Sequence, residues 1–350
     1  MTHSVKIAPL NEALTFARVE DGRIIAVTSY EDGRIFGVDL SHLKSGPEDD
    51  AIDLMASVGH AALVSAVQSG TEGLQGPAEQ LVQPVKLTSA HIAVGTNYKE
   101  HAEESAVTGS PFLFPKLVAP TGPRADIPAG RGLVDFEVEL CLVAMASLGR
   151  DAPVSGGLIL GNDVTDRAVL MRGVDLKDPQ SGKGFTDGKS ALGYLPVGDL
   201  FVAPVDLNAF VKGLTLQLSV NGEERQRAPA IEWIWDLDEI VRQARLKRNT
   251  VWSWREGEAR LAFTDDGAIP ARTLIMAGTP AGTVFQGVPG KDRIRGLIRW
   301  MLSGFRGAPV PHVIDAYIAR NITEKTFLQP GDMVTITVDG LGRLANRIVN

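Results

Sequence analysis

The stretch Asp135-Phe136-Glu137-Val138-Glu139-Leu140 decides how the rest of this chain is interpreted. On a β-strand alternate side chains point to opposite faces, so Glu137 and Glu139 share one face, as does Asp135. The stretch continues into the apolar run Leu140–Val143, where burying two unpaired carboxylates would be costly. A hard divalent cation removes that cost, because it binds oxygen ligands. The residues alone fit a second interpretation at least as well, namely a solvent-facing edge strand with two glutamates.

Further polar residues favour the first interpretation. Asp163 follows the apolar run Leu158-Ile159-Leu160, where a buried strand would end, and Lys183 adds a cation near the acids. His101 and Glu104 are three residues apart, so in a helical turn they share a face. A carboxylate beside a histidine orients the ring and raises its basicity, which helps a general base. Taken singly, a histidine near a glutamate is more often an ordinary surface pair.

The order of these elements resembles the fumarylacetoacetate hydrolase family, particularly its acylpyruvase-like members, over roughly residues 90 to 350. The segments that carry the resemblance are, in chain order, Val94-Gly95-Thr96-Asn97-Tyr98 with His101 and Glu104, Asp135–Leu140, Asn162-Asp163-Val164-Thr165 with Arg167, Lys183-Gly184-Phe185, Val220-Asn221-Gly222-Glu223, Gly278-Thr279-Pro280-Ala281-Gly282, Pro330-Gly331-Asp332 and Gly340–Asn346.

The resemblance implies a metal site and a water-activating pair. By the family's pattern, Glu137, Glu139 and Asp163 bind Mg²⁺, or alternatively Mn²⁺ or Ca²⁺. His101 and Glu104 match the pair that activates water, and Lys183 matches the lysine near the metal.

Four more residues are expected to contact the substrate: Arg167, Lys116, Tyr98 and Thr279. The Thr279 hydroxyl, with Lys183, would hold substrate or a developing anion. Arg167 fits pairing with a metal-site acid as well as with a substrate carboxylate. Lys116 fits an ordinary loop lysine as well as a site residue.

The implied activity is hydrolysis of a C–C bond in a 1,3-dicarbonyl or acylpyruvate-type 2-oxo acid. Oxaloacetate decarboxylation and dienoate isomerisation or hydration are alternatives on the same metal site. A non-catalytic protein that binds a metal or a small acid is an alternative of another class. The combination of His101, Glu104 and Lys183 argues against it, because a binding module needs no activated base.

Composition is that of an ordinary globular protein, with 44% hydrophobic and 22% charged residues among 350. The net charge of −7 argues against a general nucleic-acid binder. The one cysteine, Cys141, lies in an apolar run and is expected in the core. The first residues lack the apolar run of a signal peptide, and no segment is apolar enough to span a bilayer. We therefore expect a cytoplasmic protein that acts on a small oxo acid without nucleic-acid or membrane partners.

The sequence divides into a small N-terminal α/β domain, residues 1–85, and a catalytic domain, residues 86–350. Asp21-Gly22 predicts a β-hairpin, and residues 49–68 read as one helix. Short strands dominate the remainder, including one over residues 134–144, so the fold class is α+β. The resemblance adds a mixed β-roll for the C-terminal domain and a homodimer.

Two segments depart from the family. After Arg167, where the family has an acidic residue, this chain has Ala168-Val169-Leu170, near the expected substrate pocket. An inserted helical segment spans about 285–327, with helical spacing of five apolar residues, Ile294, Leu297, Ile298, Met301 and Leu302. This apolar stripe is expected to be covered by its own domain or by a second subunit, leaving Arg293 and Arg299 exposed. A position beside the mouth of the active site would make the insertion a substrate-selecting wall.

Overall fold

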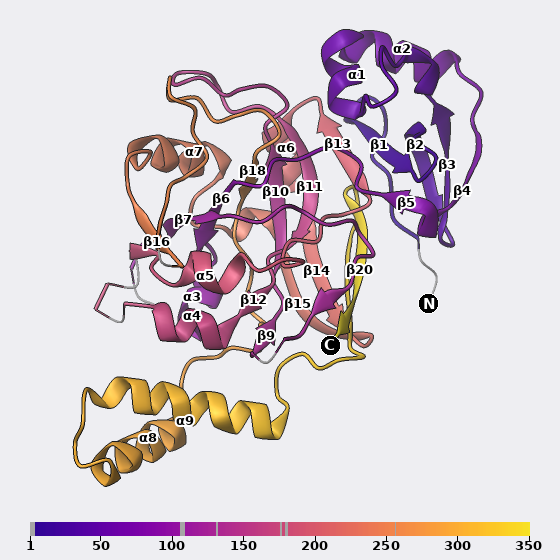
Figure 1. Cartoon of the computed structure of the whole chain (residues 1–350). Helices are drawn as coiled ribbons and strands as arrows, with labels where there is room; N and C mark the ends of the chain where they lie inside the picture. Colours follow the sequence, from indigo (N-terminus) through magenta and orange to yellow (C-terminus); the bar gives the residue numbers. More distant parts are fainter. Residues whose placement is uncertain (1–3, 106–108, 131, 176, 179–180, 256) are drawn as a thin grey trace.

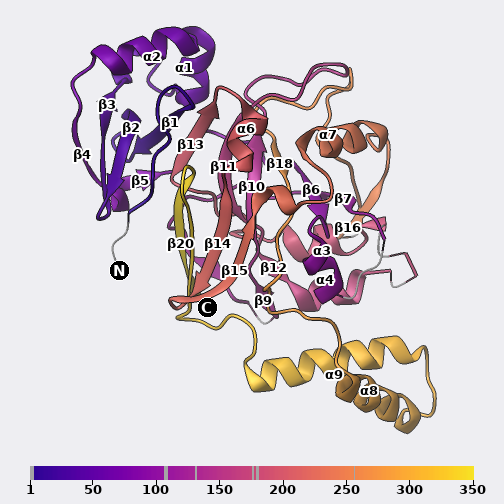
Figure 2. The ribbon, with the colours of Figure 1, turned by 180° about the vertical axis from the view of Figure 1, so that it is seen from behind.

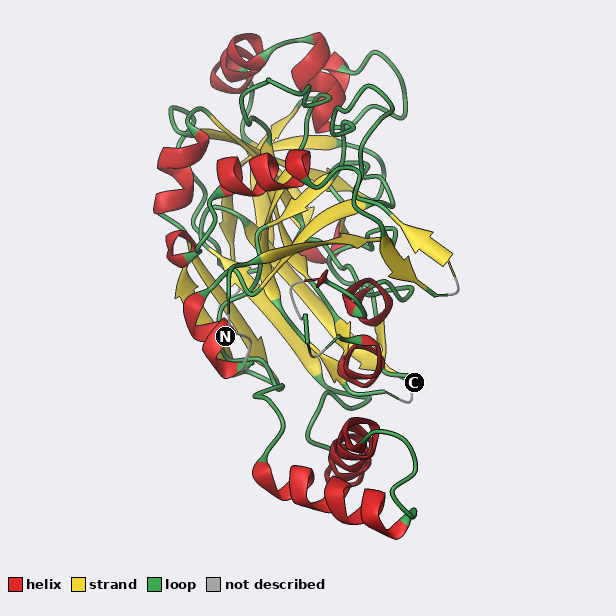
Figure 3. Cartoon of the chain, turned by 90° about the vertical axis from the view of Figure 1, so that its left-hand side faces the viewer, coloured by secondary structure: helices red, strands yellow, loops and turns green. Residues whose placement is uncertain are grey.

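A computed structural model describes residues 4–105, 109–130, 132–175, 177–178, 181–255 and 257–350 (Figure 1). Within these ranges the chain has a mixed α+β fold, with strands at the centre and helices around them (Figure 3). No single described helix is long and apolar enough to cross a membrane. The helices α1 (Ala51–Ser57) and α2 (His60–Ser69) would meet that test only as a pair, across a 108° bend.

The larger sheet carries the site-bearing strands near its middle. β18 and β6 run parallel in it, whereas β10–β11 and β1–β13 are antiparallel. Its order is β4 (Gly73–Pro77), β3 (Arg34–Asp39), β2 (Ile24–Glu31), β1 (Ala13–Val19), β13 (Leu200–Pro204), β11 (Gly157–Asn162), β10 (Val138–Val143), β18 (Leu274–Met276), β6 (His91–Gly95) and β7 (Phe112–Lys116), with β5 (Leu81–Val82) beside β1.

A second sheet and several helices complete the fold. The second sheet has the order β15 (Glu223–Pro229), β14 (Thr215–Val220), β19 (Met333–Val338), β20 (Gly342–Val349) and β8 (Ile127–Pro128). Two short ribbons are β9 (Val134–Asp135) with β12 (Thr165–Asp166) and β16 (Trp252–Trp254) with β17 (Gly257–Ala259). The helices are α1 (Ala51–Ser57), α2 (His60–Ser69), α3 (Lys99–Glu104), α4 (Arg167–Gly173), α5 (Phe185–Lys189), α6 (Leu207–Lys212), α7 (Leu237–Leu246), α8 (Gly290–Leu302) and α9 (Pro309–Glu324).

The N-terminal elements share the larger sheet with the rest of the chain. The hairpin expected at Asp21-Gly22 joins β1 to β2. The single helix expected over residues 49–68 is wrong: it breaks into α1 and α2 at Gly59, whose φ of 86° ends the helical path. Because β1 pairs with β13, a separate domain over residues 1–85 stays a prediction.

The strand expected over residues 134–144 is interrupted. β9 ends at Asp135 and β10 begins at Val138, and both β10 and β11 are buried on both faces. Side chains replace the missing ladder, because Glu137 N–H donates to Asn162 Oδ1 at 3.1 Å and Val138 N–H donates to Gln226 Oε1 at 3.0 Å. Cys141 lies buried in β10 with a free thiol, as expected.

The inserted segment forms a helical hairpin, α8–α9, which stands at one end of the molecule (Figures 1 and 2). α9 packs on the body through Ile314, Tyr317 and Ile318, which share a buried cluster with Ala168 and Met171 of α4. α8 packs mainly on α9.

The face of α8 that packs on α9 is not the apolar stripe. α8 buries Asp292 and Gly296, and the Asp292 carboxylate pairs with Arg320 Nε at 2.9 Å. The stripe is exposed in the single chain, with Ile294 at 61% and Leu302 at 82% exposure, so cover by its own domain is wrong for these residues. Cover by a second subunit stays a prediction.

Gly296→Ala is expected to loosen this hairpin, because an added Cβ would lie 2.3 Å from Val313 Cα. The helices would have to separate, which costs roughly 1–3 kcal/mol. Hydrogen exchange of α8 and α9 amides measures the effect. Gly290→Ala on the same helix, where a Cβ meets nothing within 4 Å, is the matched control. Equal exchange in both variants would contradict the close packing.

Candidate active site

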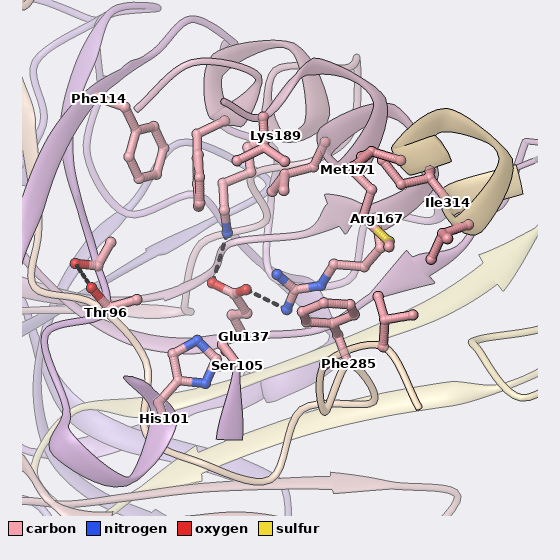
Figure 4. A pocket seen from close by; sticks show the side chains of 18 of the residues that line it. Thr96, His101, Ser105, Phe114, Glu137, Arg167, Met171, Lys189, Phe285 and Ile314 are labelled. Atoms are coloured by element: carbon pink, nitrogen blue, oxygen red, sulfur yellow. Dashed lines mark hydrogen bonds and ion pairs between the residues drawn. The ribbon is translucent and has the colours of Figure 1, made fainter. Parts of the chain in front are cut away.

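A cavity of about 500 Å³ opens between the body and the hairpin. It is lined by residues of β6, α3, α4, α5 and both hairpin helices, and its polar floor includes Glu137, His101 and Lys189 (Figure 4). The predicted site residues and the residues of the inserted hairpin therefore line the same cavity.

The structure brings Glu137, Glu139 and Asp163 together. Glu137 precedes β10, Glu139 lies within it, and Asp163 follows the antiparallel β11. The Asp163 N–H donates to the Glu137 carbonyl at 2.9 Å, which brings the ends of the two strands side by side. One carboxylate oxygen from each of the three residues lies within 4.8 Å of the others, and all three are buried.

Three buried cations surround these acids. Lys189 Nζ donates to Glu137 Oε2 at 2.7 Å and to Asp163 Oδ2 at 2.8 Å. Lys116 Nζ pairs with the other oxygen of Asp163 and donates to a backbone carbonyl. Arg167 Nη2 donates to Glu137 Oε1 at 2.6 Å, so Arg167 pairs with an acid of the cluster.

Lys183 does not reach the acids, contrary to its expected place. Its side chain is exposed, and Gly182 and Gly184 flank it with φ of 68° and 84°. This turn directs Lys183 outward at the start of α5, whereas Lys189 ends α5 against the acids. Sequence reasoning missed Lys189. The residues around Lys189 carry no signal that separates it from Lys183.

Arg167 also binds Asp135, whose role the sequence did not reveal. Arg167 Nε donates to Asp135 Oδ2 at 2.9 Å. Asp135 further accepts the N–H groups of Val284 and Phe285, at 3.0 and 3.1 Å. Asp135 therefore joins Arg167 to the segment that leads into the hairpin, and it lies outside the carboxylate cluster.

Glu139 differs electrostatically from its neighbours. Burial raises its pKa well above the ordinary value, and the charges of Asp163 and Glu137 raise it further. For Glu137 burial acts in the same direction, but Lys189 and Arg167 outweigh it and lower the pKa. Among the described residues, Glu139 accepts the Gly278 N–H at 3.0 Å and forms no ion pair. The cluster thus contains a buried carboxylate without a cation.

The two lysines also differ in electrostatics. Burial lowers the pKa of Lys116, with Asp163 opposing the change. For Lys189 burial is outweighed by Asp163 and Glu137, which raise its pKa and keep it an ammonium. Lys189 lines the cavity, whereas Lys116 lies behind Asp163 and is absent from the lining.

His101 and Glu104 lie together on α3, beside the cluster. His101 Nδ1 is 3.3 Å from Glu104 Oε2. Glu104 is itself held by the Gly282 N–H, which is 3.2 Å from both carboxylate oxygens. The imidazole faces Glu137 across the cavity (Figure 4).

Of the two remaining residues that were predicted to contact the substrate, one lines the cavity and the other does not. Thr279 lines the cavity, where its hydroxyl accepts from Gln226 Nε2 at 2.9 Å. Tyr98 does not line it: the phenol is buried and donates to the Ala230 carbonyl at 3.2 Å. The reason is the extended backbone of Tyr98 before α3, which pairs it with Trp233.

These side chains combine three chemical capacities in one space. A cluster of carboxylate oxygens suits a hard divalent cation. A histidine held by a carboxylate suits proton transfer. The Lys189 ammonium and the Thr279 hydroxyl suit an oxyanion.

Comparison with known proteins identifies a family that this chain matches. Residues 90–349 match the family model for the C-terminal domain of fumarylacetoacetate (FAA) hydrolase. Among curated relatives, 2,4-didehydro-3-deoxy-L-rhamnonate hydrolase of Sphingomonas sp. is 28% identical over 168 residues, which cover 45% of this chain and 56% of that protein. An uncharacterized protein of Staphylococcus epidermidis is 25% identical over 316 residues, covering 86% of this chain and 83% of that one.

Solved structures share the fold. Maleylpyruvate hydrolase from Sphingobium sp. SYK-6 superposes with a TM-score of 0.58 at 19% identity, covering 96% of this chain and 99% of that one. 2-Hydroxyhepta-2,4-diene-1,7-dioate isomerase from Mycobacterium marinum gives a TM-score of 0.54 at 22% identity, covering 97% and 98%. From the family model, which spans most of the sequence, we conclude that the chain belongs to the fumarylacetoacetate hydrolase family.

Proposed function

We propose that this protein is a divalent-metal-dependent hydrolase that cleaves a C–C bond in an acylpyruvate-type 2-oxo acid. The observation that carries the proposal is the meeting of the buried Glu137–Glu139–Asp163 cluster and the His101–Glu104 pair at one cavity. Hydrolases and isomerases both occur among the structural neighbours. We therefore infer the type of reaction from the residues of the site.

The residues fit a hard divalent cation. Their donors are carboxylate oxygens from three side chains, which Mg²⁺ and Mn²⁺ accept. Glu139 is buried without an ion pair to any described residue, a costly arrangement that a cation would relieve. Glu137, Glu139 and Asp163 would hold the cation. When bound, it supplies Lewis-acid polarisation of carbonyl oxygens and stabilises negative charge on them.

His101 acts as the general base in this proposal. With Nδ1 directed at Glu104, Nε2 takes a proton from a water in the cavity. The hydroxide oxygen bonds to the acyl carbonyl carbon of the substrate. Glu104, fixed by Gly282, holds the ring in the required tautomer and stabilises the imidazolium.

Bond cleavage then balances. The bond between the acyl carbon and the methylene carbon breaks, and its electron pair moves to the methylene side. The proton held by His101 returns to that carbon, giving pyruvate, and the acyl part leaves as a carboxylic acid. One water is consumed, and His101 ends neutral.

The other polar side chains orient the substrate. Thr279 lines the cavity, and its hydroxyl donates to an oxyanion of the substrate. Lys189 contributes positive charge beside it, because its three N–H groups are donated to Glu137, Asp163 and Thr165. Lys116 positions Asp163 from behind, and Arg167 positions Glu137 through its ion pair. A homodimer and a cytoplasmic location remain predictions.

A substrate screen tests the proposal. The purified protein with Mg²⁺ or Mn²⁺ is expected to cleave acylpyruvates to pyruvate, detected by coupled lactate dehydrogenase. Oxaloacetate and dienoate diacids are assayed in parallel. Decarboxylation or isomerisation without acylpyruvate cleavage would overturn the proposed reaction. Cleavage that EDTA does not affect would overturn the proposed dependence on a divalent metal.

A further inference from the structure

The cavity has two chemically different sides. The body supplies a polar floor with Glu137, Lys189 and His101, and it also contributes the apolar Val94, Phe114 and Phe185. The hairpin supplies Leu297, Pro309, Val310, Val313 and Ile314, together with Arg293. Helix α4 adds Leu170 and Met171 beside them, and Val174 follows at its C-cap. Ile314 and Met171 lie next to Arg167, so the side formed by the hairpin and α4 begins where the polar floor ends (Figure 4).

The cavity is larger than the reacting part of the substrate needs. Pyruvate has six non-hydrogen atoms, which occupy roughly 180 Å³ at the ~30 Å³ that a water molecule takes in the liquid. The cavity measures about 500 Å³. The space left over holds roughly ten more non-hydrogen atoms at the same density, and the hairpin and α4 border it.

From these facts we infer that the α8–α9 hairpin and helix α4 together form an apolar wall that selects acylpyruvates with a long aliphatic or aromatic acyl group. The inference rests on the proposed function. The apolar wall is defined as Leu170, Met171, Leu297, Val310 and Ile314. Leu297 and Val310 remain 42% and 41% exposed, so an apolar tail would cover side chains that water otherwise contacts.

The competing occupant is a tail that ends in a carboxylate. A carboxylate against the apolar wall would lose its hydration without a partner from these five residues. Arg293 is the cation that the hairpin adds to the lining; its side chain is exposed, and its Nε donates to the Val288 carbonyl at 3.0 Å. Arg293 therefore lies at the solvent side, where a charged tail would end only if it passed the whole wall.

Two substrate series test the inference. One series contains 2,4-dioxo acids with straight alkyl tails from methyl to heptyl, and the other contains the same tails ending in a carboxylate. In the alkyl series kcat/KM is expected to rise about fourfold per methylene until the space is full. The carboxylate series is expected to fall below its alkyl counterpart at each length.

A binding measurement tests the apolar wall independently of the hydrolysis reaction. N-alkyl oxamates carry a 2-oxo acid head that is not cleaved, and calorimetry with Mn²⁺ gives their Kd. Leu297→Lys is expected to lower the methyl-to-heptyl Kd ratio at least tenfold. Leu302→Lys, on the same helix and outside the cavity lining, is the matched control and should keep the parental ratio. Thermal melting checks that both variants fold.

The outcomes are distinct. Tail-dependent oxamate binding without acylpyruvate cleavage leaves the wall standing and overturns the proposed hydrolysis. Acylpyruvate cleavage at one kcat/KM for all tails, or a preference for the carboxylate series, overturns the wall while hydrolysis stands. An equal loss in Leu297→Lys and Leu302→Lys also overturns it, because the effect would then not come from the cavity.

Discussion

His101→Ala is expected to lower kcat for acylpyruvate hydrolysis by about 10²–10⁴-fold, the usual contribution of a general base. The reason is geometric: the imidazole faces Glu137 across the cavity, and Glu104 orients it at 3.3 Å. Metal binding should persist, because His101 is not part of the carboxylate cluster. Steady-state kinetics and Mn²⁺ titration measure the two effects separately.

Two further variants sharpen this test. Glu104→Gln keeps an acceptor for the Gly282 N–H but loses the charge beside the ring, so a smaller loss of kcat is expected. His42→Ala changes an exposed histidine in the N-terminal region and is expected to leave kcat unchanged. A His101→Ala variant that hydrolyses at the parental rate would remove His101 from the mechanism.

Glu139→Gln is expected to weaken divalent metal binding by at least about 10–100-fold, since changing even an outer-shell partner costs that much. The metal-free variant should melt at or above the parental temperature. Its amide is neutral, so it removes a carboxylate that is buried without an ion pair to a described residue, and it still accepts the Gly278 N–H. Calorimetry with Mn²⁺ and melting with and without metal test both expectations.

The control for this prediction is Glu103→Gln, which makes the same chemical change at an exposed glutamate of α3. At a metal concentration 100 times its Kd, the parent should gain about 2.7 kcal/mol of stability. The control should keep that gain, and Glu139→Gln should lose most of it at the same concentration. Parental metal affinity in Glu139→Gln would exclude the cluster as the metal site.

The local signal predicted that Glu137 and Glu139 share a face, and the complete cluster with Asp163 followed from the family resemblance. Alternation along a strand places Glu137 and Glu139 on one face, and the cost of burial demands a partner. The interruption at residues 136–137 could not be predicted, because Asn162 and Gln226 replace the strand ladder from distant parts of the chain. The structure keeps the two glutamates together by contacts that the sequence does not display.

The site lysine shows where local reasoning fails. Lys183 and Lys189 are six residues apart, and their neighbours do not say which one faces the acids. The turn at Gly182 and Gly184 decides it, together with the packing of α5 against β12, which follows Asp163 in the chain. Tyr98 was misplaced for a similar reason, since the Ala230 carbonyl that holds it lies 132 positions away.

The hairpin reveals a limit of hydrophobic periodicity. The spacing correctly predicted a helix at residues 291–302, but the apolar side is not the side that packs on α9. Contact with α9 is made where Gly296 permits close approach and where Asp292 meets Arg320. Periodicity marks where apolar side chains gather, and it does not identify what they contact.

Asp135 connects the base of the hairpin to the carboxylate cluster through ion pairs and hydrogen bonds. One carboxylate holds both the Arg167 guanidinium, which neutralises Glu137, and the peptide groups of Val284 and Phe285 at the base of the insertion. A change in that peptide segment therefore alters the charge balance beside Glu137 without touching any acid. Directed evolution of substrate range in this protein should diversify α8 and α9 while leaving residues 283–288 fixed, so that new specificities do not arrive with a disturbed carboxylate cluster.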